Sequence, residues 1–532
     1  MCMTVLAIQK IKHAIGIRDL LNVEKLQVQD RQRIGLIGPN GSGKTTLFNI
    51  LNGDVEADVA DFHINGSVTL LPQLKKTDTN KSGGEVTQAY ILEALARNPK
   101  LLLADEPTTN LDTSHTEWVE KQFRSFQGAI LLISHDRTFL DELCDMIWEL
   151  DEGQITEYSG NYSAYVQQKE NERKHQQKEY EKFQQKRQQL EDAIGLKERQ
   201  AQRAGKSQKK LTSSEARDAS GVSPHHQTIQ KGLHQNRKAL EKRLEKLEVV
   251  ERPEDEMPIQ MKLPNEKSFK NKVMIRAEQI KGEVGDRELW EPTTFFIKGG
   301  AKVGLIGPNG SGKTTLIRQI IANETEQLYC SPAMKIGYFA QNLNLLETER
   351  TILENVKQDA IQNETLIRTV LAQLGFYRDD VYKKIAVLSG GERVKVSLAK
   401  LLVGDYNTLI LDEPTNYLDV YALEALETLL QNYEGTLLFV SHDRHFVSEI
   451  ADNILAFEDG QLEWFKGDYK TFLDRDDSSE RDMQAEELAA IEMKITRVLS
   501  DLSHPLLATP DKEALDQEFQ ALLKQKRHLQ TE

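Results

Sequence analysis

Two stretches of the chain combine glycines, a lysine and a threonine in an order that can bind phosphate. GPNGSGKT occurs at residues 38–45 and again at 307–314. Both fit the phosphate-binding loop G-x-x-x-x-G-K-[ST], whose glycines let backbone N–H groups surround phosphate oxygens. The positive end of the helix that follows adds to the attraction. A chance glycine turn is the plain alternative for one match, but it accounts poorly for two identical copies.

These loops predict a bound nucleotide and a magnesium ion. Lys44 and Lys313 would reach the β- and γ-phosphates, and Thr45 and Thr314 would bind Mg²⁺. The predicted nucleotide ligands in the two loops are Gly38, Pro39, Asn40, Gly41, Ser42, Gly43, Lys44, Thr45 and Thr46, then Gly307, Pro308, Asn309, Gly310, Ser311, Gly312, Lys313, Thr314 and Thr315.

Acidic residues end two short apolar runs, LLLA and TLIL. Asp105 and Asp412 close these predicted strands, where a carboxylate can meet the magnesium ion. Side chains alternate along a strand, so Glu106 and Glu413 should point in another direction. We therefore expect these two glutamates to orient the water that attacks the nucleotide.

Histidine and glutamine also recur at matching positions. His135 and His442 follow further apolar runs, within SHDR, and could contact the γ-phosphate. A lone histidine there is more often a core or loop residue, but its repetition favours a function. Gln73 and Gln341 follow TLLP and IGYFA and are candidates to bind Mg²⁺ or its water.

The tetrapeptide SGGE is a different kind of candidate site. Its glycines expose backbone N–H groups beside a serine, ahead of an amphipathic helix, which makes a second place for phosphate. An ordinary helix cap is the alternative for so short a motif. Its residues are Ser82, Gly83, Gly84, Glu85, Ser389, Gly390, Gly391 and Glu392.

All these motifs occur twice in one order, which indicates two copies of one domain. RIGLIG and KVGLIG are typical of buried strands that enter loops, and TLFNIL and TLIRQII of the helices that follow. Strands that alternate with helices predict an α/β fold with a mostly parallel sheet.

Composition limits the class of protein. The 532 residues are too many for one core, and no apolar run approaches the ~18 residues of a membrane span. No secretory signal is visible, and three distant cysteines suit a reducing compartment, so we expect a cytoplasmic protein. The net charge is −15, but residues 161–250 carry +8, which indicates a polyanionic partner at that segment.

With the phosphate loop, SGGE, DEPT and SHD in this order, the chain resembles the ATP-binding cassette superfamily. Two cassettes, a charged helical linker and no membrane span resemble its ABC-F family. The resemblance implies two ATP molecules held head to tail between the cassettes of a monomer, with hydrolysis opening them. Lys44, Asp105, Glu106 and His135 would then face Ser389, Gly391 and Glu392, and Lys313, Asp412, Glu413 and His442 would face Ser82, Gly84 and Glu85.

The first copy departs from the family pattern. Only residues 74–81 separate its glutamine from its SGGE, against 342–388 in the second copy. Lys81 also stands where the second copy has Leu388, so we expect unequal ATP sites. The short first cassette resembles the Vga-type antibiotic-resistance branch of the family. General translation factors of the family usually carry an added arm in this interval, so its absence argues against them.

The segment between the copies has two narrow apolar stripes, over 162–194 and 229–248, which predict a helical hairpin. A solvated spacer is the alternative, but the positive charge favours RNA. Lys206, Lys209 and Lys210 would contact phosphates. Leu211, Val222, His225 and His226 would pack on nucleotides at the tip.

The resemblance implies that this linker enters the ribosomal E site, contacts large-subunit rRNA and P-site tRNA, and reaches toward the peptidyl-transferase centre. It suggests protection against lincosamides, streptogramin A and pleuromutilins. A general translation factor and the motor of a membrane exporter are the alternatives. The expected domains are 1–160, a first cassette with little helical subdomain; 161–255, the linker with its tip near 210–227; 256–474, the second cassette; and 475–532, a C-terminal helical extension.

Overall fold

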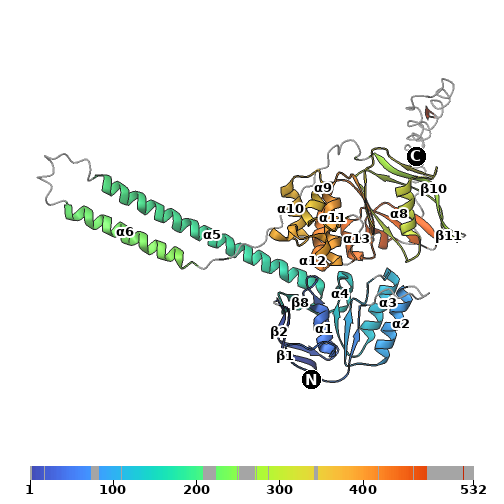
Figure 1. Ribbon diagram of the computed structural model, residues 1–532, viewed down its shortest axis with the longest axis horizontal. Helices are drawn as coiled ribbons and strands as arrows, with labels where there is room; N and C mark the ends of the chain where they lie inside the picture. The colour runs from blue at the N-terminus through green and yellow to red at the C-terminus, as the bar shows by residue number, and fades with distance from the viewer. Residues whose placement is uncertain are drawn as a thin grey trace. The chain divides into compact units, whose positions relative to one another are not determined.

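The computed structural model describes residues 3–16, 18–73, 83–109, 111–207, 223–247, 250, 270, 272–285, 287–340, 346–416, 418–458, 460–475 and 519–520. The chain divides into two compact units, Met1–Tyr469 and Lys470–Glu532. The first unit contains two α/β cassettes and a pair of long helices (Figure 1). Within the described ranges, no helix combines the length and apolar character that a membrane crossing needs.

The first cassette is built on a six-stranded sheet with the order β5-β6-β7-β3-β8-β9. Neighbouring strands are parallel except for the last pair, β8 and β9. A smaller antiparallel sheet has the order β2-β1-β4. The elements are β1 (Thr4–Ile15), β2 (Arg18–Gln29), β3 (Arg33–Ile37), α1 (Lys44–Asn52), β4 (Val59–Ile64), β5 (Val68–Leu71), α2 (Gly83–Ala96), β6 (Leu101–Asp105), α3 (Thr113–Ser125), β7 (Ala129–Ile133), α4 (Arg137–Leu143), β8 (Met146–Asp151) and β9 (Gln154–Ser159).

The second cassette repeats this topology, with the orders β14-β15-β16-β12-β17-β18 and β11-β10-β13. The duplicated α/β fold expected from the motifs is therefore confirmed. The elements are β10 (Val273–Val284), β11 (Arg287–Lys298), β12 (Lys302–Ile306), α8 (Lys313–Ala322), β13 (Leu328–Cys330), β14 (Ile336–Phe339), α9 (Ile352–Gln358), α10 (Glu364–Gln373), η2 (Arg378–Tyr382), η3 (Ile385–Val387), α11 (Gly390–Val403), β15 (Thr408–Asp412), α12 (Val420–Gln431), β16 (Thr436–Val440), α13 (Arg444–Ile450), β17 (Asn453–Glu458), β18 (Gln461–Phe465) and α14 (Tyr469–Leu473).

The central strands carry the motifs because they are buried on both faces. Every residue of β3, β6, β7, β15 and β16 is buried, which explains their continuous apolar sequences. The loops that follow these strands all leave from the same edge of each sheet, because the strands are parallel. The predicted site residues of one cassette are thereby brought together.

The two cassettes differ in one interval. Between β14 and β15 the second cassette has α9, α10, two short 3₁₀ helices and α11. The first cassette has only α2 among the described residues between β5 and β6.

The linker is a helical pair, α5 (Tyr162–Ser207) and α6 (Ser223–Glu245), which lie side by side in Figure 1. Helix α5 continues past the expected stripe, and α6 begins before its stripe but ends at Glu245. Gly195 and Gly205 do not end α5, because an interior glycine costs a helix only about 1 kcal/mol. Residues 223–227, expected in the tip, are helical, and Pro224 is tolerated because it lies in the first turn of α6. Most of the expected C-terminal extension, 475–532, lies outside the described residues.

Candidate ATP sites between two cassettes

Each phosphate loop joins the end of a buried strand to a helix N-terminus. Gly38 has a φ of 152°, and a Cβ there would lie 2.3 Å from the carbonyl oxygen of Leu150, so only glycine fits. The Lys44 ammonium donates to the carbonyl oxygens of Gly38 and Pro39, at 2.7 and 2.9 Å. The second loop repeats this arrangement, with Lys313 donating to Gly307 and Pro308 at 2.8 and 2.7 Å.

Both loops contain buried polar atoms that suit phosphate. The hydroxyl oxygens of Ser42 and Ser311 are buried without a hydrogen-bond partner among the described residues. Burial lowers the pKa of Lys44 and of Lys313, and the nearby glutamates Glu106 and Glu413 oppose this shift. A phosphate group would supply both the missing partner for each serine and the counter-charge for each lysine.

Threonine and aspartate oxygens meet at the start of each helix. The Thr45 hydroxyl donates to Oδ2 of Asp105 at 2.8 Å, and the Thr314 hydroxyl donates to Oδ2 of Asp412 at 3.2 Å. Burial raises the pKa of both aspartates, and their threonines partly offset this. A hydroxyl and a carboxylate are oxygen ligands of the kind that Mg²⁺ prefers, so the residues present fit that ion.

Glu106 and Glu413 leave their strands through an unusual backbone conformation. Their φ angles are 51° and 53°, in the left-handed region that favours glycine. The N–H of Glu106 donates to the carbonyl of Ile133 at 2.9 Å, which holds the turn. The strands end at the preceding aspartates. Strand alternation is therefore the wrong explanation for the direction of these side chains, and the left-handed turn replaces it. Such strain is typical of functional positions.

Each glutamate lies beside the histidine expected to act with it. Nε2 of His135 is 3.3 Å from Oε1 of Glu106, and Nε2 of His442 is 3.4 Å from Oε1 of Glu413. Burial, then Asp105, raises the pKa of Glu106 to about 8, and burial raises the pKa of Glu413 to about 7. Both carboxyls can therefore exchange a proton near neutral pH, where a general base works best.

The histidines are neutral in this setting. Burial, then Lys44, lowers the pKa of His135 to about 3. Burial, then Lys313, lowers the pKa of His442 to about 4. Nε2 of His442 also lies 3.0 Å from Oδ1 of Asn309 in the phosphate loop. Each imidazole can thus act as a neutral hydrogen-bonding group beside the nucleotide.

Residues of the two cassettes meet at both phosphate loops. Oδ2 of Asp419 accepts from the N–H of Asn40 at 3.1 Å, and Oδ2 of Asp112 accepts from the N–H of Asn309 at 3.2 Å. The same aspartates cap the N-termini of α12 and α3. Glu106, His135, Glu413 and His442 line one cavity together with residues of both cassettes. Sequence reasoning missed the two aspartates, although they end the repeated segments DEPTTNLD and DEPTNYLD.

The second SGGE forms a helix cap. The Ser389 hydroxyl accepts from the N–H of Glu392 at 3.3 Å, and Oε2 of Glu392 accepts from the N–H of Ser389 at 2.8 Å. Gly390 and Gly391 open α11 behind this capping box, and Gly83, Gly84 and Glu85 open α2. The geometry thus matches the alternative interpretation of the motif, and the expected role of Ser389 in the opposite ATP site stays a prediction.

The remaining predicted residues are found on other parts of the fold or fall outside the described residues. Gln73 is exposed just after β5. Lys206 is in α5, and His225 and His226 are in α6. Ser82, Gln341, Lys209, Lys210, Leu211 and Val222 lie outside the described residues.

The two sites differ in charge. Nζ of Lys395, six residues after Ser389, is 3.0 Å from Oδ2 of Asp419 beside the first phosphate loop. The corresponding position after Ser82 is Gln88, which is uncharged. In the first cassette, Asp112 instead accepts from Nδ1 of His115 at 2.6 Å and from the hydroxyl of Ser114 at 2.9 Å.

Comparison with known proteins supplies a family context. A model of the ABC transporter family matches residues 21–76 and 291–416, and a second model, also described as ABC transporter, matches 148–230. Ribosome protection protein VmlR of Bacillus subtilis is 32% identical over 94% of both chains. Erythromycin resistance ATP-binding protein MsrA of Staphylococcus epidermidis is 32% identical over 83% of this chain and 95% of its own.

Solved structures agree on the fold. An archaeal ribosome recycling factor, crystallised with the ribosomal stalk protein aP1, matches with a TM-score of 0.57 over 88% of this chain and 94% of its own. Its sequence identity is 18%. The likeness therefore concerns the fold and leaves the function to the site and to the closer sequence relatives.

Proposed function

Since this chain belongs to the ABC-F family of ATP-binding cassette proteins and is an ATPase, we propose that it protects ribosomes from antibiotics. The observation that carries the proposal is the identity of 32% to a ribosome protection protein over 94% of both chains. The match includes the linker as well as the cassettes, so the segment expected to meet RNA belongs to the shared architecture.

Hydrolysis would use the residues that meet at the ends of the central strands. Lys44 and Lys313, with the backbone of their loops, would bind the phosphates. Thr45 and Asp105 would hold Mg²⁺ in one site, and Thr314 and Asp412 would hold it in the other. The bound ion would neutralise phosphate charge. Glu106 and Glu413 would each orient a water and accept its proton, and neutral His135 and His442 would hydrogen-bond the γ-phosphate.

ATP would hold the cassettes together, and its hydrolysis would release them. The reciprocal contacts of Asp419 with Asn40 and of Asp112 with Asn309 support this role, because they connect each phosphate loop to the other cassette. The closed chain would be the ribosome-bound form of a cytoplasmic monomer, and hydrolysis would end its stay on the ribosome.

The helical linker would enter the ribosomal E site beside P-site tRNA, with its tip directed toward the peptidyl-transferase centre. Its charge of +8 over residues 161–250, in a chain of −15, supports contact with RNA phosphates. Lincosamides, streptogramin A and pleuromutilins are the drugs we expect it to counter.

Expression in a drug-sensitive strain tests the proposal. We expect higher minimum inhibitory concentrations for these drugs and ATP-dependent co-sedimentation with ribosomes. The control is Lys44→Ala combined with Lys313→Ala, which should abolish both effects by removing phosphate ligands. Co-sedimentation without any change in drug susceptibility would favour a general translation factor. Fractionation with membranes would favour an exporter motor.

A further inference from the structure

A buried carboxylate joins three parts of the chain. Glu149 lies on β8 of the first cassette, and its side chain is 7% exposed. Its Oε1 accepts from the hydroxyl of Tyr165 at 2.9 Å, and its Oε2 accepts from the ammonium of Lys169 at 2.9 Å. Both donors belong to the first turns of linker helix α5. The third donor, the hydroxyl of Tyr421, comes from α12 of the second cassette at 2.5 Å.

These donors keep the carboxylate charged despite its burial. Burial acts to raise the pKa of Glu149, but the hydrogen bonds from Tyr421, Lys169 and Tyr165 and the charge of Lys169 together lower it. Hydrogen bonds to a charged group are stronger and shorter than neutral ones, so the donors are held in a defined geometry. We call Glu149, Tyr165, Lys169 and Tyr421 the linker junction.

Helix α12 connects the linker junction to an ATP site. Its N-cap, Asp419, accepts from the N–H of Asn40 in the first phosphate loop. Two residues later Tyr421 reaches Glu149, and one turn further Glu424 accepts from the hydroxyl of Tyr162, also in α5, at 2.9 Å. Residues three apart lie on the same face of a helix, so Tyr421 and Glu424 both face the linker helix α5.

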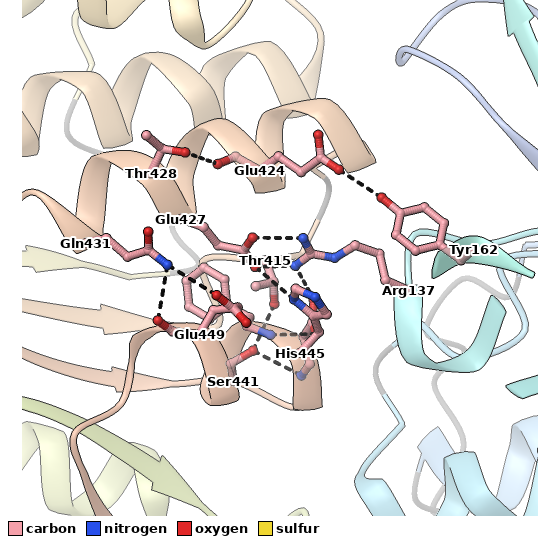
Figure 2. Close-up of polar contacts among 12 residues, drawn as sticks. Arg137, Tyr162, Thr415, Glu424, Glu427, Thr428, Gln431, Ser441, His445 and Glu449 are labelled. Carbon is pink, nitrogen blue, oxygen red and sulfur yellow. Dashed lines mark hydrogen bonds and ion pairs between the residues drawn. The ribbon is translucent and has the colours of Figure 1, made fainter. Parts of the chain in front are cut away.

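Figure 2 shows the continuation of this face. Tyr162 and Arg137 reach Glu424 and Glu427, which project from one helix of the second cassette. A change in the position of Asp419 relative to Asn40 therefore moves a helix that is bonded directly to the beginning of the linker.

The sequence carries no equivalent of the linker junction at the positions that the internal repeat relates to Glu149 and Tyr421. Glu149 pairs with Ile37 at the end of β3, and the residue that pairs with the matching Ile306 is Ala456. Ser114 occupies the place of Tyr421, two residues after the capping aspartate, and its hydroxyl donates to Asp112 on its own helix. The linker junction thus serves the ATP site at Lys44 alone.

We propose that Glu149 and Tyr421 couple closure of the cassettes at the first phosphate loop to the position of linker helix α5. When the cassettes close, Tyr421 reaches the carboxylate and fixes the first turns of α5. When they separate, the Tyr421 hydroxyl leaves, while Tyr165 and Lys169 keep Glu149 paired. The helix then remains attached to the first cassette alone and is free to change its angle.

Distance measurements between spin labels on the full-length protein test this coupling without a ribosome, so the result does not depend on the proposed function. The linker pair, with labels at exposed Gln185 on α5 and exposed Asp379 in the second cassette, measures the distance from the linker helix to that cassette. The closure pair, with labels at exposed Lys121 on α3 and Asp379, measures the distance between the two cassettes. We expect a non-hydrolysable ATP analogue to narrow both distance distributions in the wild type.

In Tyr421→Phe, the analogue should no longer narrow the distance distribution of the linker pair. It should still narrow the distribution of the closure pair. Glu149→Gln should do the same, because it removes the charge that holds the donors. Tyr180→Phe is the matched control, since in the described part of the chain that hydroxyl accepts its one hydrogen bond from Gln184 on the same helix. The control should respond as the wild type does.

Three outcomes would overturn the proposal. The first is a linker distance in the wild type that ignores the nucleotide while the closure pair responds. The second is a normal linker response in both variants. The third is loss of the closure response as well, which would assign Tyr421 to cassette pairing itself.

Discussion

Arg137 of the first cassette donates through both terminal nitrogens to the two carboxylate oxygens of Glu427 in the second cassette (Figure 2). The side chains are 2% and 8% exposed, so the pair is buried in the contact between the cassettes. The repeat places Arg444 against Glu120, where a single terminal nitrogen donates to Oε1 at 2.6 Å. This second pair is also more exposed, at 19% and 12%. The arginine of SHDR therefore joins the cassettes at two unequal positions.

Removing one partner of the buried pair should weaken cassette pairing strongly. Arg137→Ala leaves the Glu427 carboxylate without its main counter-charge, a change that typically costs about 3–5 kcal/mol. Arg444→Ala is the matched variant and should cost less, because water can solvate the more exposed Glu120. Chemical denaturation of both variants measures the difference. Equal losses of unfolding free energy would contradict the inequality of the two pairs.

The glutamates should be required for hydrolysis and dispensable for nucleotide binding. Glu106→Gln with Glu413→Gln keeps the size of the side chains and removes the proton acceptors. Turnover should fall about 10²–10⁴-fold, the usual contribution of a general base. ATP affinity should remain near the wild-type value, and on the proposed function the protein should stay on ribosomes. Normal turnover in the double variant would remove these residues from the catalytic step.

Lys395 should act on one ATP site only. Its ammonium and the N–H of Asn40 share Oδ2 of Asp419. Burial acts to raise the pKa of that carboxyl, but Lys395 and the backbone N–H groups of Ala422 and Asn40 together lower it. Lys395→Gln leaves this buried charge with fewer partners, which should weaken closure over the first phosphate loop.

Single-site backgrounds separate the two effects. In a Glu413→Gln background only the site at Lys44 turns over, and there Lys395→Gln should raise the KM for ATP. In a Glu106→Gln background the same change should have little effect. An equal change of KM in both backgrounds would show that Lys395 acts on the whole chain rather than on one site.

The sequence predicted where the candidate site residues lie on the fold better than it predicted the contacts between the cassettes. Local patterns placed the phosphate loops, Asp105, Glu106 and His135 correctly at the ends of strands, because parallel strands deliver their ends to one edge. The left-handed φ of Glu106 was missed, since a strand pattern does not reveal where the strand ends. Glu149 was also missed, because its partners lie 16, 20 and 272 residues away and only the fold brings them together.

The stability of the second cassette should depend on pH through His445, because both His445 and its partner Glu427 belong to that cassette. Nδ1 of His445 lies 3.6 Å from Oε1 of Glu427, with Arg137 and Asp443 also near. The Glu427 carboxylate raises the pKa of His445, while burial and Arg137 oppose the shift. Protonated His445 therefore adds stability that is complete below its ordinary pKa of about 6.5 and is lost as pH rises through the raised value.

Thermal unfolding across this range tests the sign. The melting temperature of the wild type should fall slightly from pH 6 to pH 8 relative to His445→Thr, which places in the second cassette the residue that the first has at Thr138. A steeper fall in the variant would contradict the assignment.

The linker should separate ribosome binding from drug protection, if the proposed function holds. Residues 212–222 contain few large apolar side chains, so replacing them with a short Gly/Ser turn should leave folding and basal ATPase activity nearly intact. Because this stretch connects the ends of α5 and α6, we expect it to be the part nearest the drug or the tRNA acceptor end. The replacement should abolish protection while the helices and their lysines still bind ribosomal RNA.

Lys206→Gln, Lys209→Gln and Lys210→Gln together should do the reverse, weakening binding and lowering its salt dependence, because fewer counterions are released. Minimum inhibitory concentrations and co-sedimentation over a salt series distinguish the two effects, and unchanged resistance after the replacement would make this stretch a spacer.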